Sequence, residues 1–561
     1  MKNSGKILLL ALMMGTLSHA QDSVNDDKKI SKEDKKIMNW YNNSKTGMST
    51  DMAYKKLLAG RKSTPVVVGV LDSGVDIEHE DLKGKIWVNT DEIPNNGIDD
   101  DKNGYIDDVN GWSFLGNANG ENANDAQLAV TRLYAKLDKK YKGKSEGDLI
   151  DSADADEFAK YLEYKKVVES SKETAEKRIA GYKGYLASLD EGHEKMKSMF
   201  GADYSDKDIK ELMKSGDEKK MKIAKLATNY KRKGEIAKGM EGGMNYFQTQ
   251  IDFYYNPDFT GDRDIIGDNP DDYNDKYYGS KDAEGPDAGH GTHVAGIIGA
   301  NRNNSIGMNG VADNAIIMSV RSVPNGDERD KDVALAIRYA VDNGAKVLNM
   351  SFGKDYAENS AEVISAIRYA EKKDVLLVHA AGNDGKNVDV EPKFPTSIYP
   401  SMSERFSNWL DIGAATRFEK PQYKKEKREK FYQIWKKRKQ VKTYSGRAAS
   451  FSNYGKTKVD VFAPGKEIYS TVPQSDYATY QGTSMAAPMV AGVAALLKSY
   501  FPNLTMMEIR SIILDSAIKA DLEVIKPGTK DEMVNFTELS REGAVVNVYK
   551  AVELAIERSK K

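Results

Sequence analysis

Short apolar runs rich in β-branched residues alternate with helix-patterned segments along this chain, and this alternation constrains the fold more than any other feature. Strands separated by helices indicate a right-handed parallel sheet with helices on both faces. The predicted fold class is therefore α/β, a three-layer parallel sheet. Strands are expected at 66–71, 315–320, 347–350 and 375–378, and helices at 333–341, 361–370 and 505–517.

Polar and small residues follow these predicted strands. Asp72 directly follows the expected strand at 66–71, and Ser351-Phe352-Gly353 follows the one at 347–350. Asn383 lies at the end of the small-residue run that follows the strand at 375–378. The carboxyl ends of parallel strands form one rim of a sheet, where open α/β proteins place their chemistry. Taken alone, Asp72 could equally well shape a turn.

Ser484 lies in the segment GTSMAAP at 482–488, after a strand-like approach and before an apolar helix of small residues. Free backbone N–H groups at a helix start favour a developing negative charge, such as the one formed when a hydroxyl attacks a carbonyl. The alternative is that Ser484 only caps the helix. His290 lies in HGTHVAG at 290–296, whose small residues predict a helix packed tightly against other backbone.

Two other kinds of chemistry fit these residues less well. A zinc site built on His290 and His293 lacks the His-Glu-x-x-His spacing, and the chain has no cysteine to add a thiolate. An α/β-hydrolase would show Gly-x-Ser-x-Gly, but Ala486 stands at the fifth position. The order Asp72, His290, Ser484 is instead the order of the catalytic residues in subtilisin.

Five segments together resemble the subtilisin-like serine proteases, in that family's order. They are DSG at 72–74, HGTHVAG at 290–296, NMSFG at 349–353, AAGN at 380–383 and GTSMAAP at 482–488. Any one of these motifs could occur by chance, but five in order make a specific signal. The similarity covers about 65–90 and 286–515 without the insertions between them.

The resemblance implies a role for each matching residue. Ser484 would be the nucleophile, His290 the general base, and Asp72 the carboxylate that orients the imidazole. Asn383 would donate to the oxyanion, and His293 would be structural. The resemblance also implies that the main chain of Ser351, Phe352 and Gly353 pairs with an extended peptide, and that Ala381 and Gly382 belong to the substrate-binding residues.

The family resemblance implies a secreted serine endopeptidase that cleaves polypeptides through an acyl-enzyme intermediate. The alternative is a catalytically inactive scaffold of the same fold whose helical insertion binds a partner. An intact set of Asp72, His290, Asn383 and Ser484 argues against the scaffold. Nucleic-acid binding is not expected, because the net charge of -2 leaves no general basic surface.

An acidic loop at 95–108 resembles the first half of a helix-loop-helix calcium loop. Asn110 replaces the glutamate at the twelfth position, so the match is partial, and a solvated acidic turn is the alternative. The predicted cofactor is Ca²⁺. The candidate ligands are Asp99, Asp101, Asn103, Tyr105, Asp107 and Asp108.

Two insertions interrupt the expected catalytic domain. The first, at 121–250, is rich in Lys and Glu and has helical periodicity, and its glycines at 181, 184, 192, 201, 216, 242 and 243 are expected to break it into several helices. It could be a solvated appendage, or a lid or docking arm. The second, at 417–447, is basic and is expected to include an amphipathic helix around Phe431, Ile434 and Trp435, which is solvated or binds an acidic polymer.

The start of the chain has the pattern of a secretory signal. Lys2 and Lys6 precede the apolar run 7–17, and small residues at 18 and 20 suit cleavage after Ala20. The run is too short to span a bilayer, so we expect an exported protein, periplasmic or extracellular, with no transmembrane segment. The predicted domains are a signal peptide at 1–20, an N-terminal extension at 21–63, a catalytic domain at 64–120 and 251–520 with insertions at 121–250 and 417–447, and a C-terminal extension at 521–561.

Overall fold

The computed structural model describes residues 31–425 and 440–560, and a nine-stranded sheet forms its centre. The strand order is β12-β15-β9-β6-β5-β4-β1-β3-β2. Neighbouring strands are parallel except for the antiparallel pair β12 and β15. The strands are β1 (Val66–Asp72), β2 (Gly111–Ser113), β3 (Ala315–Arg321), β4 (Val347–Met350), β5 (Leu376–Ala380), β6 (Trp409–Ala415), β9 (Val461–Pro464), β12 (Ile518–Lys519) and β15 (Ala544–Val545).

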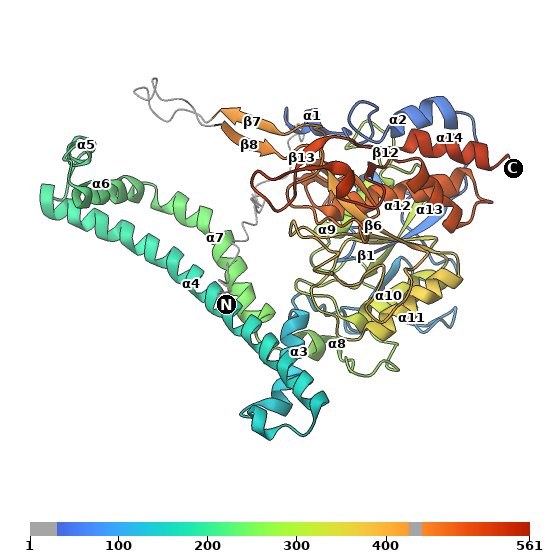
Figure 1. The fold of residues 1–561 in the computed structure, drawn as a ribbon, viewed down its shortest axis with the longest axis horizontal. Coiled ribbons are helices and arrows are strands. Elements are labelled where there is room, and N and C mark those ends of the chain that lie inside the picture. The colour runs from blue at the N-terminus through green and yellow to red at the C-terminus, as the bar shows by residue number, and fades with distance from the viewer. Residues whose placement is uncertain (1–30, 426–439, 561) are drawn as a thin grey trace.

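Helices cover both faces of this sheet (Figure 1). Alternate side chains of β1 point to opposite faces, so that Val68 and Val70 join one core and Leu71 joins the other. The first core also holds α9 (Gly289–Gly299), α12 (Thr483–Tyr500), α13 (Met506–Asp515) and α14 (Val548–Arg558). The second holds α10 (Asp330–Asp342) and α11 (Ser360–Lys372). The predicted three-layer α/β fold is confirmed, as are its expected strands and helices.

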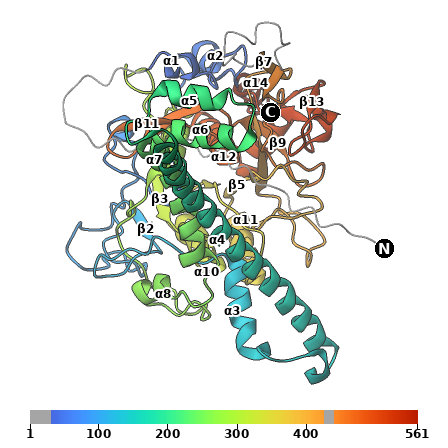
Figure 2. The same ribbon diagram turned by 90° about the vertical axis from the view of Figure 1, so that its left-hand side faces the viewer.

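The first insertion forms a helical arm that projects from the body (Figures 1 and 2). We call residues 129–249 the arm. Its longest helix, α4, has 49 residues and is therefore about 70 Å long. The arm consists of α3 (Ala129–Tyr141), α4 (Ser152–Phe200), α5 (Asp206–Met213), α6 (Glu218–Tyr230) and α7 (Lys233–Thr249).

The prediction that glycines divide the arm into short helices is wrong for most of them. α4 continues through residues 181, 184 and 192, and α7 continues through 242 and 243. A glycine inside a helix costs only about 1 kcal/mol relative to alanine, which the rest of a long helix can offset. Gly192 has a packing reason as well, because a Cβ there would lie 2.4 Å from the Cβ of Leu226 on the facing helix.

The second insertion begins and ends as an antiparallel pair, β7 (Gln422–Lys425) with β8 (Gln440–Tyr444). The helix predicted around 431–435 lies outside the described residues, as does the predicted signal peptide at 1–20. Within the described part of the chain, no helix has the length and apolar character needed to cross a membrane. The smaller elements are α1 (Asp34–Ile37), α2 (Thr50–Ala53), α8 (Gly261–Ile266), β10 (Ile468–Val472), β11 (Asp476–Tyr480), β13 (Glu523–Ile525) and β14 (Met533–Asn535).

Candidate active site

Asp72 and His290 form a hydrogen-bonded pair at the carboxyl end of β1. The Nδ1 atom of His290 lies 2.7 Å from the Oδ1 atom of Asp72. The side chain of Asp72 is 3% exposed and that of His290 is 38% exposed, so the carboxylate is covered while the ring reaches solvent. Because a carboxylate accepts, the Nδ1 atom of His290 carries the proton, and the Nε2 atom is left for another partner.

The electrostatic surroundings of His290 suit a proton acceptor. Burial by itself would lower the pKa of His290, but the neighbouring Asp72 carboxylate raises it above the ordinary value for histidine. The α9 backbone is also held close to β1, because a Cβ at Gly291 would lie 2.0 Å from the carbonyl oxygen of Gly74. Only glycine at position 291 permits this approach.

Ser484 lies in the first turn of α12, where a proline four residues later leaves the Ser484 carbonyl without its usual helical donor. Pro488 has no N–H to donate to the carbonyl of Ser484 four residues earlier. The hydroxyl of Ser351 donates to this carbonyl instead, at 2.9 Å. The start of α12 is thereby tied to the residue that follows β4.

The hydroxyl of Ser484 donates to the main-chain carbonyl of Ser351 at 3.1 Å. No hydrogen bond from this hydroxyl to His290 is found among the described residues. The two side chains are nevertheless held at the ends of adjacent strands, because Ser484 is bound to Ser351 after β4 and His290 to Asp72 of β1. β1 and β4 are paired with Leu71 opposite Met350, so Asp72 and Ser351 leave the sheet side by side.

The Asn383 amide is fixed in orientation beside the start of α12. Its Oδ1 atom accepts from the main-chain N–H of Thr483 at 2.8 Å and from the Thr483 hydroxyl at 3.1 Å. Among the described residues, the Nδ2 group of this exposed side chain donates to no protein atom. A Cβ at Gly482 would lie 3.4 Å from the Nδ2 atom, so glycine at position 482 leaves room beside it. The sequence motif shows a threonine before the serine, but its role in orienting Asn383 was not predicted.

The five predicted substrate-binding residues differ in whether their main-chain groups already make hydrogen bonds within the protein. Within the described part of the chain, the main-chain groups of Phe352 and Gly353 make no hydrogen bond. By contrast, Gly382 donates to the Thr483 hydroxyl at 3.0 Å, and Ala381 donates to the Ile412 carbonyl at 3.1 Å. Residues 351–353 can therefore pair with an extended chain through main-chain hydrogen bonds. Residues 381–382 can contact a substrate only by packing, because their main-chain N–H groups already donate within the protein.

His293 lies in the same helix as His290 but in different surroundings. It is fully buried, and its Nε2 atom lies 3.1 Å from the Ile468 carbonyl and 3.2 Å from the Ala478 carbonyl. Burial lowers the pKa of His293 to about 3, so the ring is neutral and donates to the β10–β11 hairpin. These contacts agree with the structural role that the resemblance implied.

The acidic loop brings together only part of the predicted ligand set. Oxygen atoms of Asp99, Asp101 and Glu92 lie within 4.8 Å of one another. Ca²⁺ takes oxygen ligands at about 2.3–2.6 Å, so oxygens this close together can share one ion. The residues present therefore fit a calcium ion, and Glu92, which precedes the loop motif, was missed from the sequence.

Two other predicted ligands, Asp107 and Asp108, have side-chain partners within the protein. Asp107 pairs with Lys281 at 3.1 Å, and Asp108 accepts from the Tyr339 hydroxyl at 2.7 Å. Burial raises the pKa of Asp108 to about 6. The Tyr105 ring packs among other aromatic rings, but position 7 of such a loop supplies its main-chain carbonyl, which this packing does not involve. Asn103 lies within the loop, where its main-chain N–H donates to Asp99 at 3.0 Å.

Comparison with known families agrees with this geometry. The model of the subtilase family matches residues 63–544. The match includes the strand ending at Asp72, the helix of His290 and the helix of Ser484. The chain belongs to the subtilase family.

Several characterised relatives are similar to the chain over part of its length. It is 39% identical over 231 residues to the thermophilic serine proteinase of Bacillus sp. (strain AK1), which covers 41% of this chain and 47% of that protein. It is 38% identical over 212 residues to thermitase of Thermoactinomyces vulgaris, which covers 38% of this chain and 61% of thermitase. It is 34% identical over 230 residues to subtilisin Savinase of Lederbergia lenta, which covers 41% of this chain and 70% of that relative. The chain therefore spans about half the length of the first of these relatives.

Proposed function

We propose that the protein is a serine endopeptidase that hydrolyses peptide bonds of polypeptides. One observation carries this proposal. An imidazole bound to a buried carboxylate lies at the same rim of the sheet as a serine at a helix start, with a fixed amide donor beside that serine. Relatives that are named as serine proteinases support it.

In the first half of the reaction, the Oγ atom of Ser484 attacks the substrate carbonyl carbon. The Nε2 atom of His290 takes the hydroxyl proton, and Asp72 stabilises the imidazolium that forms. Rotation about the Cα–Cβ bond of Ser484 releases its hydroxyl from the Ser351 carbonyl. His290 then gives its proton to the leaving amine, the C–N bond breaks and an acyl-enzyme remains. Water, deprotonated by His290, hydrolyses this ester and restores Ser484.

Negative charge on the carbonyl oxygen is stabilised by two donors. The Nδ2 group of Asn383 is one, and the main-chain N–H of Ser484 at the start of α12 is the other. Because Thr483 already holds the Oδ1 atom of Asn383, the amide need not reorganise as the charge develops. Preorganised donors of this kind make a large contribution to catalysis.

Substrate binds as an added strand along residues 351–353. The unpaired main-chain groups of Phe352 and Gly353 supply its hydrogen bonds. Binding through main-chain groups accepts many sequences, and it positions the scissile bond next to Ser484 because Ser351 contacts Ser484 directly.

Replacement of the nucleophile tests this function. We expect Ser484→Ala to lower kcat for a fluorogenic casein by about a millionfold, the size known for the same change in subtilisin. Ser403→Ala is the control, since Ser403 is an exposed serine outside the site. Cleavage by Ser484→Ala at a rate close to that of the unchanged protein would rule out the assignment.

We also propose that Ca²⁺ binds to Glu92, Asp99 and Asp101. When bound, the ion would neutralise three converging carboxylates and so stabilise the loop at 92–108. The bound ion is structural, because the proposed ligands do not include Asp72, His290 or Ser484.

Export is the third part of the proposal. The basic, apolar and small-residue pattern of residues 1–20 supports transport across a membrane, to a periplasmic or extracellular location. A protease that acts on polypeptides in general is compatible with such a location.

A further inference from the structure

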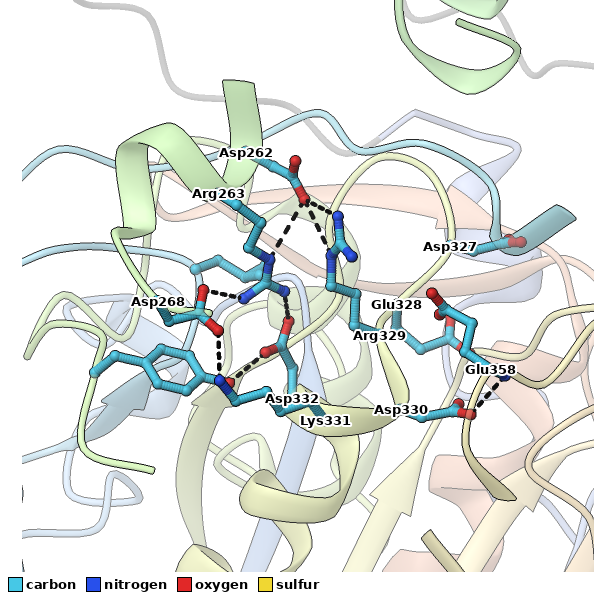
Figure 3. A network of polar contacts seen from close by, with 12 residues as sticks. Asp262, Arg263, Asp268, Asp327, Glu328, Arg329, Asp330, Lys331, Asp332 and Glu358 are labelled. Atoms are coloured by element: carbon cyan, nitrogen blue, oxygen red, sulfur yellow. Dashed lines mark hydrogen bonds and ion pairs between the residues drawn. The ribbon is translucent and has the colours of Figure 1, made fainter. Parts of the chain in front are cut away.

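Buried charged residues join the base of the arm to the loops that follow β3 and β4. We call Arg132, Asp327, Glu328, Asp330, Lys354 and Glu358 the arm-root cluster. Figure 3 shows Asp327, Glu328, Asp330 and Glu358 in one region of the molecule. Both loops start at the rim of the sheet that carries the candidate active site. Removing one partner from a buried ionic cluster is costly, because it leaves the remaining charges uncompensated.

Arg132, on the first arm helix α3, binds both loops at once. Its Nε and Nη2 atoms donate to the Glu358 carboxylate at 2.7 Å and 2.6 Å. Its Nη1 atom donates to the Asp327 carbonyl at 3.0 Å, and its Nη2 atom to the Glu328 carbonyl at 3.2 Å. The Arg132 side chain is 6% exposed. A planar guanidinium that binds a carboxylate through two donors fixes the orientation of both groups.

Lys354 carries this connection to the substrate-binding segment. Its Nζ atom lies 2.8 Å from Asp330 and 3.2 Å from Glu358, and it donates to the Glu328 carbonyl at 2.6 Å. The ammonium has no exposure to solvent. Lys354 directly follows Gly353. Its main chain exchanges two hydrogen bonds with Phe394, and its side chain ends in the cluster, so both contacts hold the end of the 351–353 segment.

The charges of Glu358 and Lys354 are maintained by their partners, whereas burial raises the pKa of Asp327 and raises that of Glu328 to about 8. Burial alone would raise the pKa of Glu358, but Arg132 and Lys354 hold it well below the ordinary value. Burial alone would lower the pKa of Lys354, but Asp330 and Glu358 raise it. The loss of one partner would leave the others charged and unpaired in a buried place, so the loops would have to rearrange.

The arm meets the same loop at a second point. The ring of Tyr164, on α4, packs edge-on against the ring of Tyr356 at 5.4 Å between centroids. In addition, the carboxylate of Asp327 accepts from the main-chain N–H of Ala129 at the start of α3, at 2.9 Å. Two arm helices and the loops at 327–330 and 354–358 therefore share one contact region.

We propose that Arg132 is a positioning residue for the substrate-binding segment at 351–353, and that the arm is thereby part of the substrate-binding apparatus. Arg132 touches neither the substrate nor the reacting atoms. It acts through Glu358 and Lys354, which set the direction in which Phe352 and Gly353 present their main-chain groups. This inference rests on the proposed function.

Arg263 supplies a matched control. It is equally buried, with its side chain 8% exposed, and its Nη1 atom lies 2.7 Å from Asp268. It also pairs with Asp332 on α10. Within the described residues, none of these partners belongs to the loop at 351–358. Asp262 connects Arg263 through Arg329 to residues 328–330. Loss of Arg263 therefore disturbs the same buried ionic region without removing a direct contact to the loop at 351–358.

The experiment compares Arg132→Met and Arg263→Met in the full chain. Two peptide substrates are used, with one residue and with four residues before the scissile bond, because only the longer peptide lies along 351–353. For Arg132→Met we expect KM of the longer peptide to rise about tenfold with kcat nearly unchanged. Labelling of Ser484 by a small fluorophosphonate, which does not use the segment, should keep its rate. Arg132→Lys should give a smaller rise in KM, because lysine keeps the positive charge but cannot bind the Glu358 carboxylate through two parallel N–H donors.

Two results would overturn the positioning role. One is an unchanged KM for the longer peptide in folded Arg132→Met, and the other is an equal rise in KM in Arg263→Met. If Arg132→Met does not fold, Tyr164→Ala decides, with an expected rise in KM of about two- to fivefold, and an unchanged KM refutes the proposal. If the unchanged protein takes no label at Ser484 and cleaves neither peptide, the proposed function itself fails, and the positioning role fails with it.

Discussion

At the scale of single residues, the difference in solvent exposure between Asp72 and His290 determines how the site responds to pH. The carboxylate is covered and the imidazole is partly exposed. The imidazolium is therefore stabilised by a charge that solvent screens poorly, while its Nε2 atom remains accessible. The raised pKa of His290 is a direct consequence of this arrangement.

We expect the acidic limb of the kcat/KM profile to have its midpoint above 6.5, the ordinary pKa of histidine. Below that midpoint His290 is protonated and cannot accept the Ser484 proton, so activity falls as pH falls. Asp72→Asn should move the limb to lower pH and reduce kcat by about ten-thousandfold. The measurement is kcat/KM between about pH 5 and 9 for both proteins.

The control for this profile is a stability measurement at each pH, which separates unfolding from loss of the base. An acidic limb at or below 6.5 in the unchanged protein, or a limb that stays in place in Asp72→Asn, would contradict the role of the pair.

The chemically distinctive residues could be predicted from the sequence, but their supporting residues could not. Asp72, His290, Asn383 and Ser484 stand in motifs whose order and residue types are specific. Thr483 holds Asn383 through two hydrogen bonds that depend on where β5 and α12 meet. No local pattern in the sequence reveals such a contact.

At the scale of elements, the cation affinity that we propose for the loop at 92–108 depends on which of its carboxylates lie close together. Asp99, Asp101 and Glu92 converge, while Asp107 is held by Lys281 and by main-chain N–H groups. Glu92 and Asp99 also accept main-chain N–H groups, so what distinguishes Asp107 is its ion pair with Lys281 and its absence from the converging set.

We expect a chelator to lower Tm, because a ligand that binds only the folded state stabilises it by about 3 kcal/mol at a hundredfold excess over Kd. Glu92→Gln should reduce the response of Tm to added Ca²⁺. Asp107→Asn is the matched control and should respond as the unchanged protein does. The same Tm with and without chelator, or a full calcium response in Glu92→Gln, would argue against the site.

The elements themselves were predictable to different degrees. Strands β1, β3, β4 and β5 follow from β-branched runs, and α10 and α11 from helical periodicity. The continuity of α4 could not be predicted, because Gly192 packs closely against α6, while Gly181 and Gly184 face open space at a cost that the long helix offsets. The anchoring of the arm by Arg132 depends on residues 195 to 226 positions away, which no sequence window contains.

At the scale of the whole molecule, the arm and the sheet meet at the arm-root cluster, next to the rim that carries the candidate site. The chain keeps the motifs of the subtilase family around a long insertion between Asp72 and His290. The insertion is compatible with the site because the Asp72 and His290 side chains still pair across it. Insertions are tolerated where the ends of the inserted segment remain close together.

The central claim is that Asp72, His290 and Ser484 act together on an acyl group. Its most direct measurement is the reaction of the full chain with a fluorophosphonate, followed by mass-spectrometric mapping of the labelled residue. We predict a label on Ser484 in the unchanged protein and almost none in His290→Ala, because the hydroxyl needs a base. A folded protein that takes no label, or a label on Ser484 that forms equally fast in His290→Ala, would contradict the account.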